Sequence, residues 1–361
     1  MMKPDCLVAG GGIIGLMTAR ELREAGLSVT VVERQRVGRE ASWASSGILS
    51  PMYPWRHPHA VTVLARWAEN QYPHLAQRLQ EESGVDPEWR LSGMLILDAE
   101  EEALARDWAI QHRTPLEYLQ GDELVKHEPR LNLREFHEAL WLPRIAQIRP
   151  PRLLRALQSA VRRMGVHVLE DSPVRSLISR HGKITGVETP AGPLEADYVV
   201  IATGAWSRTF LAQVHVDVDI RPVRGQIILY QGDPGWLARM VMHQDHYVIP
   251  RADGRIVAGS TVEYVGFDKN TTPEAVNLLH GAARRMIPGL ENFAIEKHWA
   301  GLRPGKADNV PVIGRHPTLE GLYINAGHFR SGVVLAPASA RLLADIILGR
   351  PPIVDPAPYA V

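Results

Sequence analysis

Two arginines and a tyrosine have the side chains needed to hold a small anion. A guanidinium presents two parallel donors to a carboxylate, a match that a lysine ammonium does not offer. Arg303 lies in the segment 301–305, and Arg330 lies directly before a predicted helix, where a cation opposes the helix dipole. Tyr247 adds a phenol donor on the predicted strand 247–250. Each residue also has a structural alternative: a surface arginine in a loop for Arg303, an interdomain salt bridge for Arg330, and half-buried packing for Tyr247.

The clearest motif lies near the amino terminus. An apolar strand at 6–9 runs into the pattern G-x-G-x-x-G at Gly10, Gly12 and Gly15, and a helix follows. Glu33 ends the next strand, where an acidic side chain accepts hydrogen bonds from ribose hydroxyls in dinucleotide-binding folds. A strand before the glycines, a helix after them and an acid at this place predict a dinucleotide site rather than a structural glycine turn. The motif alone leaves NAD and FAD open.

Two later stretches favour a flavin. Residues 40–51 follow the ribose-binding strand and are rich in small side chains that could line an extended ligand, although an ordinary small-residue loop would look similar. Residues 197–206 read as a strand running into the turn Ala-Thr-Gly, and a three-stranded meander is predicted over 174–196 before it. A meander followed by such a strand and turn is typical of two-dinucleotide-binding flavoproteins.

Seven segments in order carry a resemblance to a known family. They are GGGIIG at 10–15, the loop 40–51, SPVRSL at 172–177, ATGAW at 202–206, YVIPR at 247–251, WAGLRPG at 299–305 and AGHFRSG at 326–332. The chain resembles the D-amino-acid oxidase family of FAD flavoproteins, and within it the glycine oxidase type that serves thiamine biosynthesis. The match extends over nearly the whole chain.

The resemblance implies an α/β fold: a Rossmann-like FAD-binding domain with an inserted antiparallel-sheet substrate domain. The FAD-binding domain is expected from residues 1–83, 147–215 and 304–361, and the substrate-binding domain from 84–146 and 216–303. The residue pattern agrees with this division. It predicts a helix from Pro151, antiparallel strands over 220–230, 247–250 and 255–261, and a closing strand and helix over 321–325 and 333–348.

The resemblance also assigns site residues. Arg303 is expected to clamp a substrate carboxylate, Tyr247 to donate to the same group, and Arg330 to make a second contact. Backbone amides of 328–334 are expected beside the flavin. The expected FAD-binding residues are Gly10, Gly12, Ile13, Ile14, Gly15, Glu33, Arg34, Ala41, Ser42, Ser46, Gly47, Ile48, Val174, Gly204, His328, Phe329, Arg330, Ser331, Gly332, Val333 and Val334. The flavin is expected to be noncovalent, because a thioether tether of the kind found in sarcosine oxidases needs a cysteine in the last third of the chain.

The expected reaction is oxidation of glycine, and also of sarcosine and small D-amino acids, to the 2-oxo acid and ammonia or an amine. The flavin carries the hydride step, so no side chain needs to act as the catalytic base. Oxygen is the expected acceptor and becomes peroxide. Two alternatives stay open: a D-amino-acid dehydrogenase that passes electrons to a quinone, and a non-catalytic FAD-binding module. Val262 stands where a methionine is expected, which leaves pocket volume and substrate range open.

Composition narrows the remaining classes. The 361 residues include 40 basic and 40 acidic side chains, and this zero net charge argues against a nucleic-acid or anionic-membrane binder. Cys6 is the only cysteine, so no internal disulfide forms. We expect no membrane span, because no run of about eighteen apolar residues stands out, and no metal site, because the histidine pairs 57/59 and 243/246 lack acidic or cysteine companions. A cytoplasmic protein is expected, and the related oxidases suggest a homotetramer.

Overall fold

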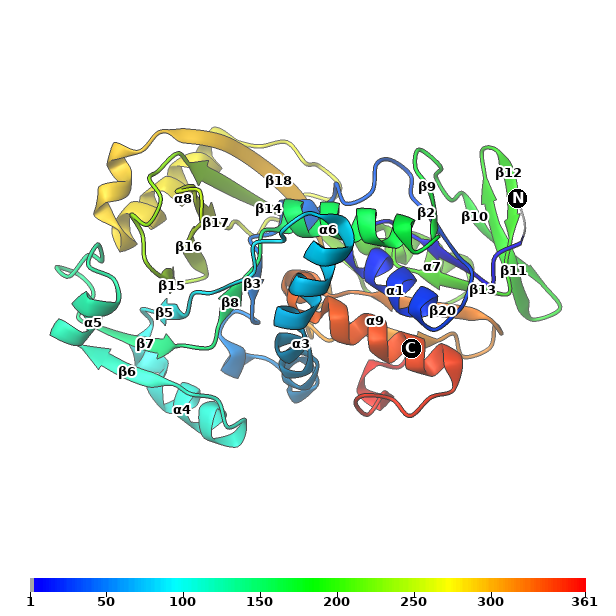
Figure 1. Cartoon of the computed structure of the whole chain (residues 1–361), viewed down its shortest axis with the longest axis horizontal. Helices are drawn as coiled ribbons and strands as arrows, with labels where there is room; N and C mark the ends of the chain where they lie inside the picture. The colour runs from blue at the N-terminus through cyan, green and yellow to red at the C-terminus, as the bar shows by residue number, and fades with distance from the viewer. Residues whose placement is uncertain (1–2) are drawn as a thin grey trace.

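A six-stranded sheet forms the right-hand half of the molecule in Figure 1, a computed structural model that describes residues 3–361. The strand order is β19-β20-β13-β1-β2-β9, and every neighbouring pair is parallel except β19–β20. The strands are β1 (Cys6–Ala9), β2 (Val29–Val32), β9 (His167–Leu169), β13 (Tyr198–Ile201), β19 (Val312–Arg315) and β20 (Leu322–Ala326). Runs such as Val-Thr-Val-Val in β2 are buried throughout, as expected of a parallel sheet covered on both faces.

Four helices form a layer against this sheet. They are α1 (Ile13–Glu24), α3 (His59–Ser83), α6 (Pro150–Arg163) and α9 (Gly332–Leu348). Helix α9 packs against α1 and α3, and α6 packs against both of those helices as well. Their apolar faces meet strand β1 in one continuous hydrophobic core.

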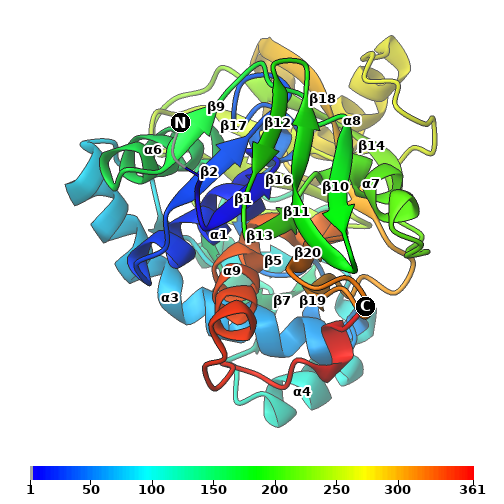
Figure 2. The ribbon, with the colours of Figure 1, turned by 90° about the vertical axis from the view of Figure 1, so that its right-hand side faces the viewer.

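The opposite face of the sheet is covered by a meander that stands in front in Figure 2. Its strands are β10 (Ser176–Arg180), β11 (Lys183–Thr189) and β12 (Gly192–Glu195), and helix α7 (Ser207–Gln213) packs beside β10. The meander contacts β13 through β11. These strands span 176–195, so the meander predicted over 174–196 is confirmed to within two residues at each end.

An eight-stranded sheet forms the other half of the molecule, with the order β18-β14-β17-β16-β15-β5-β7-β6. Its strands are β5 (Met94–Ile96), β6 (Glu117–Gln120), β7 (Glu138–Leu142), β14 (Arg221–Tyr230), β15 (Met240–His243), β16 (His246–Pro250), β17 (Ile256–Gly259) and β18 (Ile295–Gly305). All pairs are antiparallel except β15–β5, which join the two separate chain segments that build the sheet. Helix α8 (Pro273–Met286) packs on β14, β16 and β17, and α4 (Glu102–Gln111) and α5 (Asp122–His127) lie near the β6 edge (Figure 1).

Short elements connect the two halves. A small sheet has the order β3-β8-β4, formed by β3 (Ile48–Leu49), β4 (Arg90–Leu91) and β8 (Ala146–Gln147). The short helix α2 (Ala41–Ala44) contacts α6 on one side and β18 on the other. Single 3₁₀ turns occupy Pro54–Arg56, Ala99–Glu101, Gly204–Trp206, Pro288–Asn292, Phe329–Ser331 and Ala357–Tyr359.

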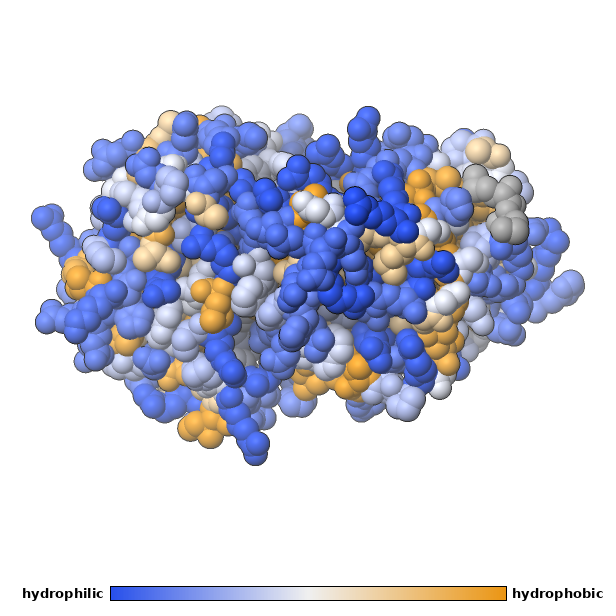
Figure 3. All heavy atoms as spheres, viewed as in Figure 1, coloured by the Kyte–Doolittle hydropathy of each residue, from blue (hydrophilic) through white to orange (hydrophobic). Residues whose placement is uncertain are grey.

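The last helix corrects one expectation. The segment Phe329–Leu348 is long and apolar enough to cross a membrane by length and composition, although no such run was expected. In the described chain 72% of this segment is buried, and α9 packs between α1 and α3, so it is the core helix of the six-stranded half. The face of the molecule in Figure 3 is mostly hydrophilic, with small separate hydrophobic patches.

The α/β class and the predicted antiparallel character of the second sheet are confirmed. The boundaries of the two domains stay predictions, although each sheet draws its strands from the chain segments expected for it.

Candidate active site

A cavity of about 380 Å³ lies where the carboxyl ends of β1, β13 and β20 face the eight-stranded sheet. This is the edge of a parallel sheet at which ligands bind in open α/β folds, and the volume is that of a small-molecule site. Its lining includes most of the residues expected from the sequence: Gly10, Gly12, Ile13, Ile14, Glu33, Arg34, Ala41, Ser42, Ser46, Val174, Gly204, Tyr247, Arg303, His328, Phe329, Arg330, Gly332 and Val333.

Five of the expected residues do not line the cavity: Gly15, Gly47, Ile48, Ser331 and Val334. Gly15 lies in α1 and faces the strand before it. A Cβ atom added there would come 1.9 Å from the carbonyl oxygen of Gly10, so Gly15 permits close packing of helix and strand. Ile48 lies in β3 and pairs with Gln147 of β8 in the small sheet. The predicted segments reach the cavity, while the fold decides which of their residues line it.

The glycine turn after β1 is shaped to let a ligand approach the backbone. Gly10 has a φ of +108°, and a Cβ atom there would lie 2.3 Å from the carbonyl oxygen of Ala202. Helix α1 begins at Ile13 after Gly12, and the amide of Ile13 donates to the hydroxyl of Ser42 at 2.9 Å. A helix start at the end of a glycine turn suits a pyrophosphate, so these residues fit the ADP half of FAD.

Glu33 lies at the end of β2, as predicted. Its carboxylate accepts hydrogen bonds from the amides of Gly11 at 2.7 Å and Gln35 at 3.0 Å. These bonds fix the carboxylate beside the glycine turn while the residue still lines the cavity. This position suits the ribose role inferred for Glu33.

Arg34 takes part in a stack that the sequence did not reveal. Its guanidinium lies 3.5 Å from the ring centroid of Trp206 and donates to Glu40 at 2.6 Å. The ring of Trp206 also stacks on Phe267, with centroids 5.3 Å apart, although these residues belong to the two different halves of the chain. Trp206 lies in the quoted segment ATGAW, so its position was visible, but its stacking partners are distant in sequence.

A buried arginine, Arg251, binds the cavity-lining loop that contains Ser46. Arg251 is 5% exposed and follows the strand that carries Tyr247. It donates to the side chain of Gln147 at 2.7 Å, to the carbonyl of Ile148 at 3.2 Å and to the carbonyl of Ser46. Burial lowers the pKa of Arg251 to about 10, and the neighbouring cation Arg149 acts in the same direction. Arg251 therefore ties the eight-stranded sheet to the loop that lines the cavity.

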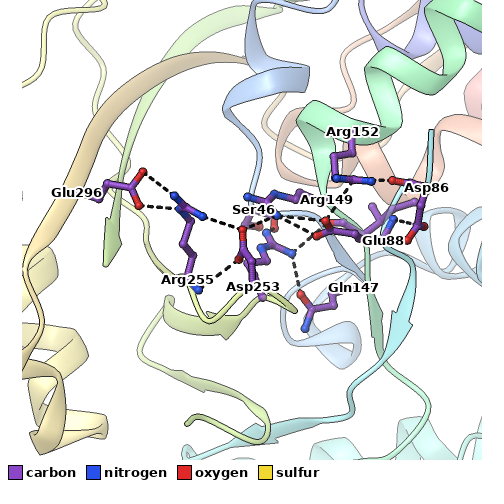
Figure 4. A network of polar contacts seen from close by, with 11 residues as sticks. Ser46, Asp86, Glu88, Gln147, Arg149, Arg152, Asp253, Arg255 and Glu296 are labelled. Carbon is purple, nitrogen blue, oxygen red and sulfur yellow. Dashed lines mark hydrogen bonds and ion pairs between the residues drawn. The ribbon is translucent and has the colours of Figure 1, made fainter. Parts of the chain in front are cut away.

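Ion pairs surround this contact, as Figure 4 shows. Arg149 bridges Glu88 at 3.1 Å and Asp253 at 2.9 Å, and Arg255 continues the network from Asp253 to Glu296. The network joins the turn after β16 to the segment that leads into α6. The local geometry of the cavity wall is thus fixed from both halves of the protein.

Arg303 is the cation at the substrate end of the cavity. It lies in β18, opposite Val223 of β14, so the alternative of a loop arginine is wrong. Its guanidinium donates to Ser260 Oγ at 2.8 Å and to the carbonyl of Thr261 at 3.0 Å. No carboxylate within residues 3–361 forms an ion pair with it. Burial lowers the pKa of Arg303 to about 10, and the charge of Arg330 also lowers it. Because this pKa is still well above 7, Arg303 is a cation at neutral pH, and it has no counter-ion among these residues.

Tyr247 lies on β16 and is 3% exposed. Its hydroxyl lines the cavity and makes no hydrogen bond to the part of the chain that the structure describes. Gly259 of the neighbouring strand leaves room for the phenol, because a Cβ atom there would come 2.7 Å from Tyr247 Oη. Arg303 and Tyr247 together offer donors to one anion.

Arg330 lies at the cavity, as expected, and also forms the salt bridge that was weighed as its structural alternative. It lines the cavity, and it also forms a 2.9 Å ion pair with Asp245 from the turn between β15 and β16. The salt bridge between the two halves, weighed as an alternative, is therefore present. The helix dipole is opposed by the Arg330 charge, and Asp245 offsets that cost.

The turn before α9 places His328 and Gly332 at the cavity. Burial lowers the pKa of His328 to about 3, and its Nε2 lies 3.0 Å from Ser339 Oγ, so the ring is neutral at ordinary pH. Helix α9 begins without a side-chain cap and without an acidic residue in its first turn. Its first amides are free for a ligand.

Val262 does not bear on the volume of the cavity. Its side chain is 41% exposed, and it is absent from the cavity lining. The pocket volume that was left open at Val262 is therefore set by other residues, because Val262 faces outward after the buried Thr261. Four residues that were not among the predicted site residues also line the cavity: Met52, Thr203, Trp206 and Ser260.

Comparisons with known proteins show which family the chain resembles over most of its length. The family model described as "FAD dependent oxidoreductase" matches residues 5–346. A glycine oxidase of Pseudomonas aeruginosa is 45% identical over 360 residues, which is 99% of each protein. A bifunctional protein ThiO/ThiG of Synechocystis sp. is 31% identical over 95% of this chain, which spans 51% of that protein. The crystal structure of glycine oxidase from Geobacillus kaustophilus has a TM-score of 0.96 at 27% identity, covering 100% of this chain and 98% of that one.

Proposed function

The chain belongs to the family of FAD-dependent oxidoreductases, and from this premise we propose that it oxidises glycine to glyoxylate and ammonia, with oxygen reduced to hydrogen peroxide. The balanced reaction takes up one oxygen and one water for each glycine. The relatives named glycine oxidase support this substrate. The observation that carries the proposal is Arg303, an enclosed guanidinium without a carboxylate partner at the end of the FAD-binding cavity.

FAD supplies the electron acceptor for this chemistry when it is bound. The glycine turn at 10–15 would hold its pyrophosphate, Glu33 its ribose, and the turn at 328–334 its ring system. The amides at the start of α9 would stabilise negative charge at that end of the cavity, because they form the positive end of a helix without an acidic cap. Cys6 is buried in β1, so it forms no tether.

The substrate contacts follow from the free donors. Arg303 would take the carboxylate with two parallel hydrogen bonds, since Ser260 and Thr261 hold its guanidinium in one plane. Tyr247 would donate its free hydroxyl to the same carboxylate. Fixing the carboxylate orients the α-carbon for hydride loss, which is the main contribution that a protein makes in such a reaction. The amine reacts in its neutral form, so no side-chain base is assigned.

The proposal extends to sarcosine and small D-amino acids as further substrates, and to a homotetramer in the cytoplasm. It also includes supply of the thiazole branch of thiamine biosynthesis. The similarity to about half of a bifunctional protein ThiO/ThiG supports this role. These points rest on similarity alone.

Anaerobic mixing of the purified yellow holoprotein with glycine tests the proposal. We expect the flavin absorbance to bleach to the level reached with dithionite, and air to restore it with one peroxide formed per glyoxylate. A flavin that stays oxidised with glycine, sarcosine and D-alanine would support a non-catalytic FAD-binding module. Slow recovery in air but rapid recovery with a soluble quinone would support the D-amino-acid dehydrogenase alternative.

A further inference from the structure

The two cations at the substrate end of the cavity differ in their partners. Arg303 forms no ion pair with any residue from 3 to 361, whereas Arg330 donates to Asp245 Oδ1 at 2.9 Å. The other Arg330 nitrogen contacts the sulfur of Met52 at 3.1 Å. Arg303, Arg330 and Asp245 sum to a net charge of plus one, which one substrate carboxylate would balance, and the carboxylate of Glu263 also acts on Arg303.

Asp245 is held in place by a buried support. Gln244 and Asp245 form the turn between β15 and β16, with φ values of +45° and +66°. The carboxylate of Asp98 accepts the amide of Gln244 at 3.1 Å, and the hydroxyl of Tyr53 accepts the amide of Asp245 at 3.3 Å. Tyr53 in turn donates to Asp98 at 2.6 Å, and both side chains are buried. A turn fixed in this way keeps the Asp245 side chain facing Arg330.

The ion pair makes a second anion on the substrate unfavourable. A ligand whose side arm ended in a carboxylate near Arg330 would meet the negative charge of Asp245 as well. It would have to displace Asp245 from Arg330 or remain unpaired, and either event costs binding free energy. Selection through a repulsive group of this kind discriminates between ligands of equal size and unequal charge.

We propose that Asp245 is a specificity-determining residue that restricts this site to amino acids with a single carboxylate. The inference deepens the proposed function and rests on it for the identity of the site. Asp245 is 47% exposed at the outer side of Arg330 and does not line the cavity itself. It therefore acts on the substrate through Arg330, and its effect is on charge selection rather than on the reacting atoms.

Succinate and its monoamide, succinamate, test this inference in the intact holoprotein. The two molecules have nearly the same shape, differ by one charge, and have no amine to be oxidised. Binding is measured from the change in flavin absorbance, and also from competitive inhibition of glyoxylate formation from glycine. We expect the natural protein to prefer succinamate. Asp245→Asn should shift the ratio of the two dissociation constants about tenfold toward succinate, since one like charge is removed near the ligand.

Two further variants separate charge from structure. Asp245→Glu keeps the charge, so the ratio should stay within twofold of the natural value. Arg330→Gln combined with Asp245→Asn should remove the gain for succinate, because the freed guanidinium is what binds the second carboxylate. All variants are compared at equal FAD content.

The outcomes are distinct from those of the glycine test. An unchanged ratio in Asp245→Asn, including the case in which succinate does not bind at all, overturns the inference. A shift of equal size in Asp245→Glu also overturns it, because charge would then not be the cause. Failure of glycine to bleach the flavin, with the expected shift in succinate affinity, would instead overturn the proposed reaction and leave the charge selection in place.

Discussion

Replacement of Arg303 by lysine tests the core of the substrate site. The guanidinium donates to Ser260 Oγ, to the carbonyl of Thr261 and, at 3.5 Å, to the carbonyl of Arg224, and in the proposed site its remaining N–H groups would bind the substrate carboxylate. A lysine ammonium keeps the charge and gives up one of two parallel charge-assisted hydrogen bonds. Such a bond is worth about 1.5–3 kcal/mol. This loss corresponds to a fall in kcat/KM of about 10- to 150-fold.

The assay is a peroxide or glyoxylate measurement across a range of glycine concentrations, with anaerobic flavin reduction to separate binding from hydride transfer. We expect most of the loss to appear as a raised KM, because the clamp holds the carboxylate in both the ground state and the transition state. Tyr247→Phe is a matched control that removes a neutral donor at the same carboxylate and should cost less. A KM within twofold of the natural value for Arg303→Lys, at normal FAD content, would remove Arg303 from the clamp.

Three further predictions concern the cofactor site and its stability. Glu33→Ala should weaken FAD binding by about 10- to 100-fold, because the variant lacks the ribose acceptor and leaves the Gly11 amide without its partner. The flavin fluorescence retained after dialysis measures FAD occupancy, and full occupancy in the variant would contradict the prediction. Arg251→Met should lower both the melting temperature and FAD retention, since the Ser46 carbonyl loses its donor. Unchanged melting and flavin content would refute the tie between the eight-stranded sheet and the loop at Ser46. His328 binds a proton in the unfolded chain below about pH 6.5 but in the folded protein only below about pH 3. It therefore lowers the free energy of unfolding as pH falls, by about 1.4 kcal/mol per pH unit in that window. Denaturant titrations at several pH values should show the unfolding free energy of the natural protein falling more steeply than that of His328→Asn between pH 6 and pH 4, and an equal fall in both would show that the ring is not buried as a neutral group.

Sequence reasoning succeeded where a local pattern has one physical cause. The glycine spacing at 10–15 specifies a turn and a helix start because the first and third glycines have no room for a Cβ atom. The strands before Glu33 and before Gly204 could be predicted because each is an apolar run bounded by turn residues, and such runs form buried strands. Arg303 was singled out because its neighbours matched a family pattern, and the structure places it at the cavity, while its substrate role stays a prediction.

The missed features depend on partners far apart in the chain. Nothing near Arg251 indicates that it reaches the carbonyl of Ser46, and nothing near Trp206 indicates that Arg34 and Phe267 both stack on its ring. The effect of Val262 on the pocket was left open in the sequence, because the direction of its side chain depends on how the chain continues after Thr261. The apolar run of α9 was overlooked because Arg341 and Asp345 interrupt it, although a core helix between two others can hold both.

The strand order of the six-stranded sheet has a consequence for synthesis of the protein. The central strand β1 is made first, yet its neighbour β13 follows nearly two hundred residues later, and β20 and α9 are among the last elements to leave the ribosome. The wall that would face the ring system of the cofactor is therefore absent throughout most of translation. We expect the nascent chain to hold FAD only once it is almost complete. A chain that stops before residue 332 would release an apoprotein with an exposed core, a natural target for chaperones and proteases.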